Sequence, residues 1–153
     1  MEQVFKDNGI KTEIILVGNK DIRGCIACGS CYEKGKCVFN DMVNELALKF
    51  EEADGLVVAS PVYYASANAT LIACLDRLFY SSHFDKTMKV GASVVCARRG
   101  GCSATFDELN KYLQSPECRL HQASIGTAFM DVCRVSQSRT EKENRRCVHL
   151  QEI

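Results

Sequence analysis

Short apolar runs alternate along the chain with segments whose hydrophobic residues recur at helical spacing. Three runs are rich in β-branched residues and span residues 12–18, 55–60 and 89–97. Because these runs are almost continuously apolar, they predict strands buried on both faces, as in a parallel sheet. The helical segments fall between the strands, which predicts an α/β layered fold with right-handed crossovers.

Three helices are predicted between and after these strands. The first covers residues 40–54, where Asp41 is placed to cap the N-terminus. Its apolar face is formed by Val43, Leu46, Ala47 and Phe50. A second helix follows Ser66, and a third covers about residues 104–113. The apolar face of the second helix is formed by Leu71, Leu75, Leu78 and Phe79.

The pattern changes after Leu113. Residues 114–153 show neither the helical nor the strand period and end in a mostly polar stretch. We therefore predict that residues 1–113 form a partial domain and that residues 114–153 are an irregular tail that is not native to the fold.

The composition is that of one globular domain, with 153 residues, 46% hydrophobic and 25% charged. The formal net charge is zero, which argues against nucleic acid or a membrane as a partner and favours small molecules. The N-terminus has no apolar leader, and no run approaches the roughly 18 residues that span a bilayer. We therefore expect a cytoplasmic protein.

The ten cysteines are unusual for such a protein. Without a secretion signal, they indicate reduced thiols or metal ligands rather than a disulfide framework. Cys74 and Cys96 fall in apolar runs and are predicted to be core residues. The histidines have no clustered partner and are predicted to lie at the surface: they are His83, His121 and His149.

Four cysteines share the stretch GCIACGSCYEKGKCVFND, residues 24–41, with the spacing C-x2-C-x2-C-x5-C. They are Cys25, Cys28, Cys31 and Cys37. Zinc prefers two separated C-x-x-C pairs, whereas this spacing is closer to that of ferredoxin clusters. It departs from the ferredoxin run because Val38, not proline, follows the fourth cysteine. The alternatives are a [4Fe–4S] cluster, reduced thiols, zinc or redox-active disulfides.

Ligands of open α/β sheets bind outside the carboxyl ends of the strands. The stretch SPVYYAS, residues 60–66, follows the second predicted strand and offers two tyrosines and backbone amides that lead into a helix. The stretch ARRGGCS, residues 97–103, follows the third, with two arginines and two glycines that allow close backbone approach. A flat, electron-poor, phosphate-bearing ligand would suit both loops. The alternative is a pair of surface turns with the tyrosines packed at the sheet end.

These motifs carry a resemblance to a known family. Residues 24–41, 52–82 and 94–112 together closely resemble the flavodoxin-like NADPH-dependent FMN reductases, a family that includes the iron–sulfur flavoproteins. The resemblance covers about residues 1–113. It implies a doubly wound parallel sheet of strand order 2-1-3-4-5, noncovalent FMN at the strand ends, NAD(P)H as co-substrate and, in intact relatives, a homo-oligomer.

The resemblance also implies which residues contact the cofactors. One side of the isoalloxazine ring would be wrapped by the loop Ser60, Pro61, Val62, Tyr63, Tyr64 and Ala65. The other side would be lined by Ala97, Arg98, Arg99, Gly100 and Gly101. The flavin would carry the redox chemistry, so no catalytic acid or base is expected. The four clustered cysteines would bind a [4Fe–4S] cluster that passes single electrons from the reduced flavin to a small-molecule or protein acceptor.

Two parts of the family pattern are missing. The family begins with a strand and a Ser/Gly/Asn-rich loop that holds the FMN phosphate at a helix N-terminus. Residues 1–18 read instead as the end of the first helix and the second strand, which leaves strand edges open. The fifth strand is also expected to be absent. A set of codons that can encode residues 117–131 also encodes, when read in a shifted frame, a peptide similar to that fifth strand. We therefore hypothesise a frameshift near residue 114. The alternative is a divergent C-terminus.

The leading functional hypothesis is an FMN-dependent NAD(P)H oxidoreductase. Because the phosphate loop is not found, we expect this chain to bind FMN weakly or not at all. The alternatives are an inactive fragment, a small metal-binding electron carrier without flavin, or an interaction module held together by zinc.

Overall fold

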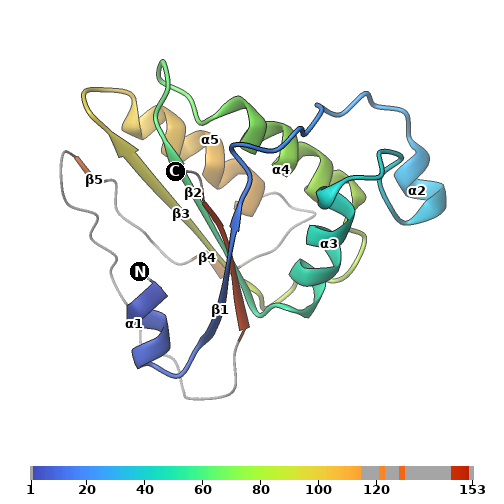
Figure 1. The fold of residues 1–153 in the computed structure, drawn as a ribbon, viewed down its shortest axis with the longest axis horizontal. Helices are drawn as coiled ribbons and strands as arrows, with labels where there is room; N and C mark the ends of the chain where they lie inside the picture. Colours follow the sequence, from blue (N-terminus) through green and yellow to red (C-terminus); the bar gives the residue numbers. More distant parts are fainter. Residues whose placement is uncertain (1, 115–120, 123–127, 130–145, 152–153) are drawn as a thin grey trace.

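The chain forms a parallel sheet with helices on both faces (Figure 1). The computed structural model describes residues 2–114, 121–122, 128–129 and 146–151, and the last three segments are described by their backbone alone. The strand order is β1-β6-β2-β3-β4, and β5 also pairs with β3. The strands are β1 (Lys11–Leu16), β2 (Gly55–Pro61), β3 (Val90–Ala97), β4 (His121–Gln122), β5 (Ala128–Phe129) and β6 (Arg146–Gln151).

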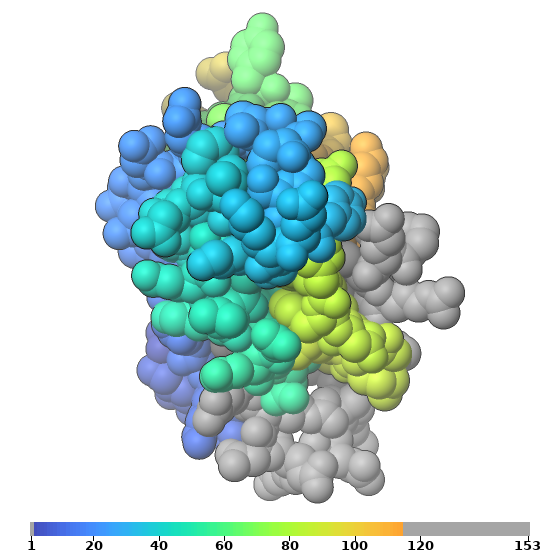
Figure 2. Space-filling view, turned by 90° about the vertical axis from the view of Figure 1, so that its right-hand side faces the viewer, coloured from blue at the N-terminus to red at the C-terminus, as the bar shows by residue number. Residues whose placement is uncertain are grey.

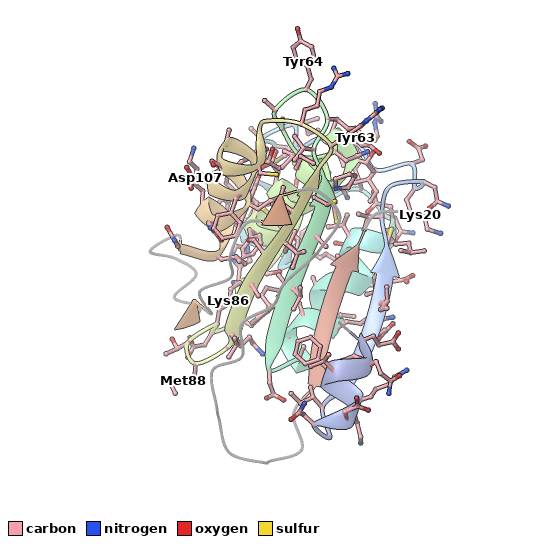
Figure 3. The ribbon with its side chains drawn as sticks, turned by 90° about the vertical axis from the view of Figure 1, so that its left-hand side faces the viewer. Lys20, Tyr63, Tyr64, Lys86, Met88 and Asp107 are labelled. Atoms are coloured by element: carbon pink, nitrogen blue, oxygen red, sulfur yellow. The ribbon has the colours of Figure 1, made fainter. Side chains whose placement is uncertain are left out.

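The helices are divided unequally between the two faces of the sheet. Helices α3, α4 and α5 cover one face, and α1 lies on the other, as the views in Figures 1 and 3 show. The helices are α1 (Glu2–Asp7), α2 (Ser30–Lys34), α3 (Met42–Glu52), α4 (Ala69–Ser81) and α5 (Cys102–Gln114). The predicted α/β class with a parallel sheet is confirmed, and α2 is a short helix that the sequence pattern did not predict.

The main core lies between the sheet and α3, α4 and α5. It is built from aliphatic and aromatic side chains that are almost completely buried, among them Leu46, Phe50, Leu56, Val58, Leu71, Leu75, Leu78, Val95 and Leu109. Phe50 meets Phe79 and Phe84 edge to face, with ring centroids 5.9 and 5.2 Å apart. On the opposite face, Phe5 of α1 packs against a smaller cluster.

Both of the helices that flank β2 begin at a side-chain cap. Asp41 caps α3 as predicted, and its Oδ1 accepts a hydrogen bond from the Val43 amide at 3.1 Å. Asn68 caps α4 by accepting from the Thr70 amide at 2.6 Å. Each cap satisfies an amide that the first turn leaves without an intrahelical partner, so the two helices begin at fixed positions beside the strand ends.

Burial differs from the prediction in two places. β1 was predicted to be buried on both faces, but its residues are exposed or half-buried, with Ile14 39% and Leu16 36% exposed. Cys74 is buried as predicted, whereas Cys96 is exposed. Successive side chains of a strand point to opposite faces, and Cys96 shares its face with Ala92, on the side that α1 covers only in part.

Parts of the predicted tail pair in the sheet. β6 lies between β1 and β2, and β4 and β5 lie beside β3. In the order 2-1-3-4-5, β6 takes the position of the first strand, and β4 and β5 take the position of the fifth. The sequence analysis predicted no strand at either position. An unfilled position would expose rows of backbone donors and acceptors, and a strand that pairs there satisfies them. The proposed boundary near residue 114 and the frameshift stay predictions.

Among the described residues, no helix is both long enough and apolar enough to cross a membrane.

We predict that Phe50→Ala will lower the free energy of unfolding by about 3–5 kcal/mol, because it opens a cavity in the main core. Leu48→Ala is the matched control on the same helix, since Leu48 is 65% exposed, and it should change stability by less than about 0.5 kcal/mol. Urea unfolding followed by circular dichroism measures both. Equal losses in the two variants would contradict the assignment of this face of α3 to the core.

Candidate cofactor and metal site

Three loops meet at the carboxyl edge of the sheet. The cysteine loop (residues 17–40) follows β1, the tyrosine loop (residues 61–67) follows β2, and the arginine loop (residues 98–101) follows β3. Because the strands are parallel, all three loops leave the sheet at the same edge. Figure 3 shows Lys20, Tyr63 and Tyr64 toward this end of the sheet and Met88 at the other.

The tyrosine and arginine loops are in direct contact. The Val62 amide donates to the carbonyl of Cys96 at 2.8 Å, which continues the β2–β3 ladder past the end of β2. Gly101 has a φ of +96°, and a Cβ there would lie 2.8 Å from the Cα of Ala65. Only glycine fits such a position without displacing backbone. The predicted flavin residues of the two loops are therefore brought together.

The tyrosine loop has an unusual backbone that the surrounding residues hold in place. Tyr64 and Ala65 have φ values of 52° and 63°, a region that L-residues seldom adopt. Glu108 of α5 fixes the end of the loop, since its carboxylate accepts from the Ser66 hydroxyl at 2.9 Å and from the Ala67 amide at 3.0 Å. Strained backbone that is held by other parts of a fold is typical of ligand-binding loops.

The side chains of these loops leave an open surface at the sheet edge. Tyr64 is fully exposed and Tyr63 is 54% exposed, and Figure 3 shows Tyr64 pointing outward at the tip of the loop. Arg98 and Arg99 are exposed as well. Two aromatic rings, two guanidinium groups and a glycine-lined backbone contact suit a flat, anionic ligand.

An open surface pocket of about 700 Å³ lies between the tyrosine loop, α4 and the cysteine loop. Its lining includes Tyr63 and Tyr64, residues 66–70 from the end of the tyrosine loop to the first turn of α4, and Gly24, which directly precedes Cys25. Asp76 and Glu108 also line it. The pocket is therefore lined by residues of both the predicted flavin loop and the cysteine loop.

The predicted metal ligands are all accessible within the cysteine loop. Cys25 and Cys28 are exposed, and Cys31 and Cys37 are half-buried. Figure 2 shows this loop and α3 together on one face of the molecule. Four reduced thiols suit an iron–sulfur cluster or zinc. In the part of the chain that the structure describes, no three His, Cys, Asp or Glu side chains are arranged to hold a metal ion.

Cys37 is the most firmly held of the four cysteines. Its amide donates to Oδ1 of Asn44 at 2.9 Å, and Nδ2 of Asn44 donates back to the Cys37 carbonyl at 3.2 Å. Asn44 belongs to α3, so the fourth cysteine is tied to a helix. The side chain of Cys37 accepts a hydrogen bond from Nε of Arg77 on α4, at 3.2 Å.

The sequence interpretation missed Arg77. It is 1% exposed and forms a two-pronged ion pair with Asp41, with N–O distances of 2.6 and 2.7 Å. Arginine is almost never fully buried unless it is paired. Its place among the apolar residues Leu71, Cys74 and Leu78 on α4 was the signal that it would have a buried partner.

The ion pair alters the titration of both partners. Burial alone would raise the pKa of Asp41, but hydrogen bonds from Arg77 and from the Val43 amide outweigh it and hold that pKa below its ordinary value. Burial alone would lower the pKa of Arg77, and its hydrogen bonds to Asp41 and Cys37 raise it instead. The pair therefore stays charged throughout the physiological pH range.

His83 lies at the surface as predicted, but it has a role in the cysteine loop. Its Nε2 lies 3.0 Å from the Cys31 carbonyl, and its ring packs against Tyr32 at 5.4 Å. His83 thereby anchors α2 to the end of α4. The side chains of the other two histidines lie outside the described residues.

The sequence model of the NADPH-dependent FMN reductases matches residues 1–135. An iron–sulfur flavoprotein of Methanocaldococcus jannaschii is 36% identical over 109 residues, which covers 69% of this chain and 56% of the relative. An iron–sulfur flavoprotein of Methanosarcina thermophila is 35% identical over 115 residues, which covers 72% of this chain and 60% of the relative. The chain thus spans little more than half the length of these relatives. No solved structure matches it.

The contact between the tyrosine and arginine loops can be tested by adding one methyl group. We predict that Gly101→Ala destabilises the protein by about 1–3 kcal/mol, because the new Cβ meets the Ala65 backbone at a positive φ. Gly100→Ala is the control, since a Cβ at Gly100 meets nothing within 4 Å. Thermal unfolding without added ligand measures both. A Gly101→Ala variant as stable as Gly100→Ala would contradict the close contact.

Alkylation of the native protein at pH 8 should separate the cysteines by environment. Hydrogen bonds from Ser30 lower the pKa of the exposed Cys28, whereas burial raises the pKa of Cys74 to about 12. The thiolate is the reactive form, so Cys74 should react about 1000-fold more slowly than Cys28. Mass spectrometry after iodoacetamide treatment reports each site, and the rates should converge in denaturant. Fast native labelling of Cys74 would contradict its place in the core.

Proposed function

Because the chain belongs to the NADPH-dependent FMN reductase family, we propose that it is a flavin-dependent oxidoreductase of the iron–sulfur flavoprotein type. It takes electrons from NADH or NADPH through FMN and passes them, by way of a [4Fe–4S] cluster, to a small-molecule or protein acceptor.

The observation that carries the flavin part is the contact between the tyrosine and arginine loops. Gly101 lies against Ala65 so closely that a Cβ would fill the junction. The same junction is flanked by Tyr63 and Tyr64 on one loop and by exposed arginines on the other. These residues fit the isoalloxazine ring in shape and charge.

Bound FMN would supply hydride acceptance and single-electron transfer. The residues of this chain would bind and orient the ring. Residues 60–65 would contact one side of it and residues 97–101 the other, and the tyrosines would limit access of water. The positive charge of Arg98 and Arg99 would favour the electron-rich reduced ring.

The assignment of a cluster is supported by the chemistry of its four predicted ligands, which are all cysteines. Cys25, Cys28, Cys31 and Cys37 are all accessible as thiols, and Arg77 and Asn44 hold Cys37 in place. Single-electron transfer between FMN and an iron–sulfur cluster would let the protein convert the two electrons of a nicotinamide into single-electron steps. A surface pocket is lined by Tyr63 and Tyr64 of the tyrosine loop and by Gly24 of the cysteine loop, so residues of the two loops that would hold the cofactors face one space.

Visible absorbance of the anaerobically purified protein, reconstituted with iron, sulfide and excess FMN, tests this proposal. We expect flavin bands and a broad cluster absorption, and both should bleach on addition of NADPH or NADH. A broad absorption that only dithionite bleaches, without flavin binding, would support the alternative of a small electron carrier. A protein that stays colourless would contradict both cofactor assignments, and stoichiometric zinc without colour would support a zinc-bound module.

The arginine loop can be tested separately by FMN titration, followed through quenching of flavin fluorescence. The double variant Arg98→Ala/Arg99→Ala should weaken FMN binding about three- to fivefold, as expected for loss of about 0.7–1 kcal/mol of exposed charge interaction. Lys6→Ala/Lys11→Ala removes the same charge near the amino edge of the sheet and should leave the affinity unchanged. An equal effect of both variants would mean that only net charge matters.

A further inference from the structure

Arg77 is a buried cation in contact with a predicted cluster ligand. It lies on α4 with 1% of its surface exposed, next to Leu78, which is completely buried. A buried guanidinium is costly unless its N–H groups are satisfied. Four hydrogen bonds leave this group, and each has a distinct acceptor atom.

The four contacts divide between a carboxylate, a carbonyl and a sulfur. Two N–H groups donate to the two carboxylate oxygens of Asp41, at 2.6 and 2.7 Å. Nη1 also lies 3.3 Å from the Arg23 carbonyl, within the cysteine loop. Nε donates to Sγ of Cys37 at 3.2 Å. The guanidinium on α4 therefore contacts the cap of α3 and two separate points of the cysteine loop, at Arg23 and Cys37.

An aromatic ring covers the guanidinium near the sulfur. The centre of the Arg77 guanidinium lies 5.0 Å from the Phe39 ring, and Arg23 lies over the same ring at 5.3 Å. Phe39 is two residues from Cys37 in the sequence. The Phe39 ring and the Cys37 sulfur both contact the Arg77 guanidinium. The ring attracts the guanidinium through a cation–π interaction, and Arg77 is almost completely shielded from solvent.

The choice of acceptor is informative. A neutral thiol is a weak acceptor, whereas a thiolate that ligates a metal carries negative charge and accepts strongly from a charged donor. The ion pair with Asp41 already balances the charge of Arg77, and it fixes the plane of the guanidinium. Nε is thereby aimed at Sγ of Cys37.

We propose that Arg77 is a positioning residue for Cys37 as a ligand of the iron–sulfur cluster, and that its Nε–H raises the reduction potential of that cluster. The inference rests on the proposed function, because it needs the cluster. Hydrogen bonds to the sulfur ligands of a cluster stabilise its reduced, more negative state. Arg77 would thereby hold Cys37 in place, and Cys25, Cys28 and Cys31 would supply the other three thiolates.

The test compares Arg77→Lys with Arg23→Lys in the reconstituted, anaerobic protein. Lysine at position 77 keeps the charge beside Asp41 but cannot hold the carboxylate by two parallel bonds and also donate to Cys37. Arg23→Lys is the matched control, since Arg23 faces the same ring but contacts the site through its backbone carbonyl. Circular dichroism checks folding, iron and sulfide content checks loading, and a redox titration followed by EPR gives the midpoint potential.

We expect Arg77→Lys to shift the reduction equilibrium about tenfold toward the oxidised cluster, which is about 59 mV for a one-electron couple, and Arg23→Lys to leave it unchanged. Loss of the cluster from a folded Arg77→Lys protein would also support the positioning role. A loaded Arg77→Lys protein with the wild-type potential would overturn the proposal.

A second variant covers the case in which lysine at position 77 prevents folding. Arg77→Met/Asp41→Asn removes both charges of the pair together, so no uncompensated charge is left buried. A lowered potential or a lost cluster in this folded variant supports the proposal, and an unchanged potential overturns it. If neither variant folds, Arg77 serves folding and the proposal is rejected. If the wild-type protein takes up no cluster, the proposed function itself fails, and the inference falls with it.

Discussion

The parallel pairing of β2 with β3 is the constraint on which the candidate site depends. Seven residue pairs hold the register, from Gly55 opposite Val90 to Pro61 opposite Cys96, and the bond from the Val62 amide continues it into the loops. Parallel strands end at the same edge, so this register alone brings the tyrosine and arginine loops together. A slip by one residue would turn every side chain of one strand to the other face and would separate Ala65 from Gly101.

A second constraint, the ion pair of Arg77 with Asp41, connects that edge to the cysteine loop. Helix α4 begins at Ala69, directly after its cap Asn68 and the tyrosine loop, and carries Arg77 about 12 Å further along its axis, at a rise of about 1.5 Å per residue. One rigid helix therefore determines both the end of the predicted flavin loop and the position of the Cys37 sulfur. Loss of the Asp41 charge would leave the buried Arg77 without its partner, at a cost of about 3–5 kcal/mol.

Local signals in the sequence were sufficient for some of this structure and not for the rest. The apolar runs predicted β2 and β3, and Asp41, which precedes an apolar helix face, predicted the start of α3. Both predictions were possible because strand burial and helix capping depend on residues that are close in the sequence. Arg77 was missed because its partners lie 36 and 40 residues away, although a lone arginine in an apolar stripe indicates a buried partner. The exposure of Cys96 depends on how far α1 covers the sheet, which periodicity does not report. The spacing of the four cysteines suggests a metal but does not position it, because coordination depends on how the ligands are arranged in space.

The position of β6 bears on the distance between the two predicted cofactors. Cys147 of β6 pairs with Thr12 of β1 on one side and with Gly55 of β2 on the other. β6 therefore fixes the register of β1 relative to β2. Adjacent strands lie about 4.8 Å apart, and a strand between β1 and β2 therefore separates them by about 10 Å. The cysteine loop leaves the end of β1 and the tyrosine loop leaves the end of β2, so any strand in this position sets the spacing at which the two loops leave the sheet. The identity of its side chains matters less for that spacing than its backbone, because the ladder on each side is made by backbone groups alone.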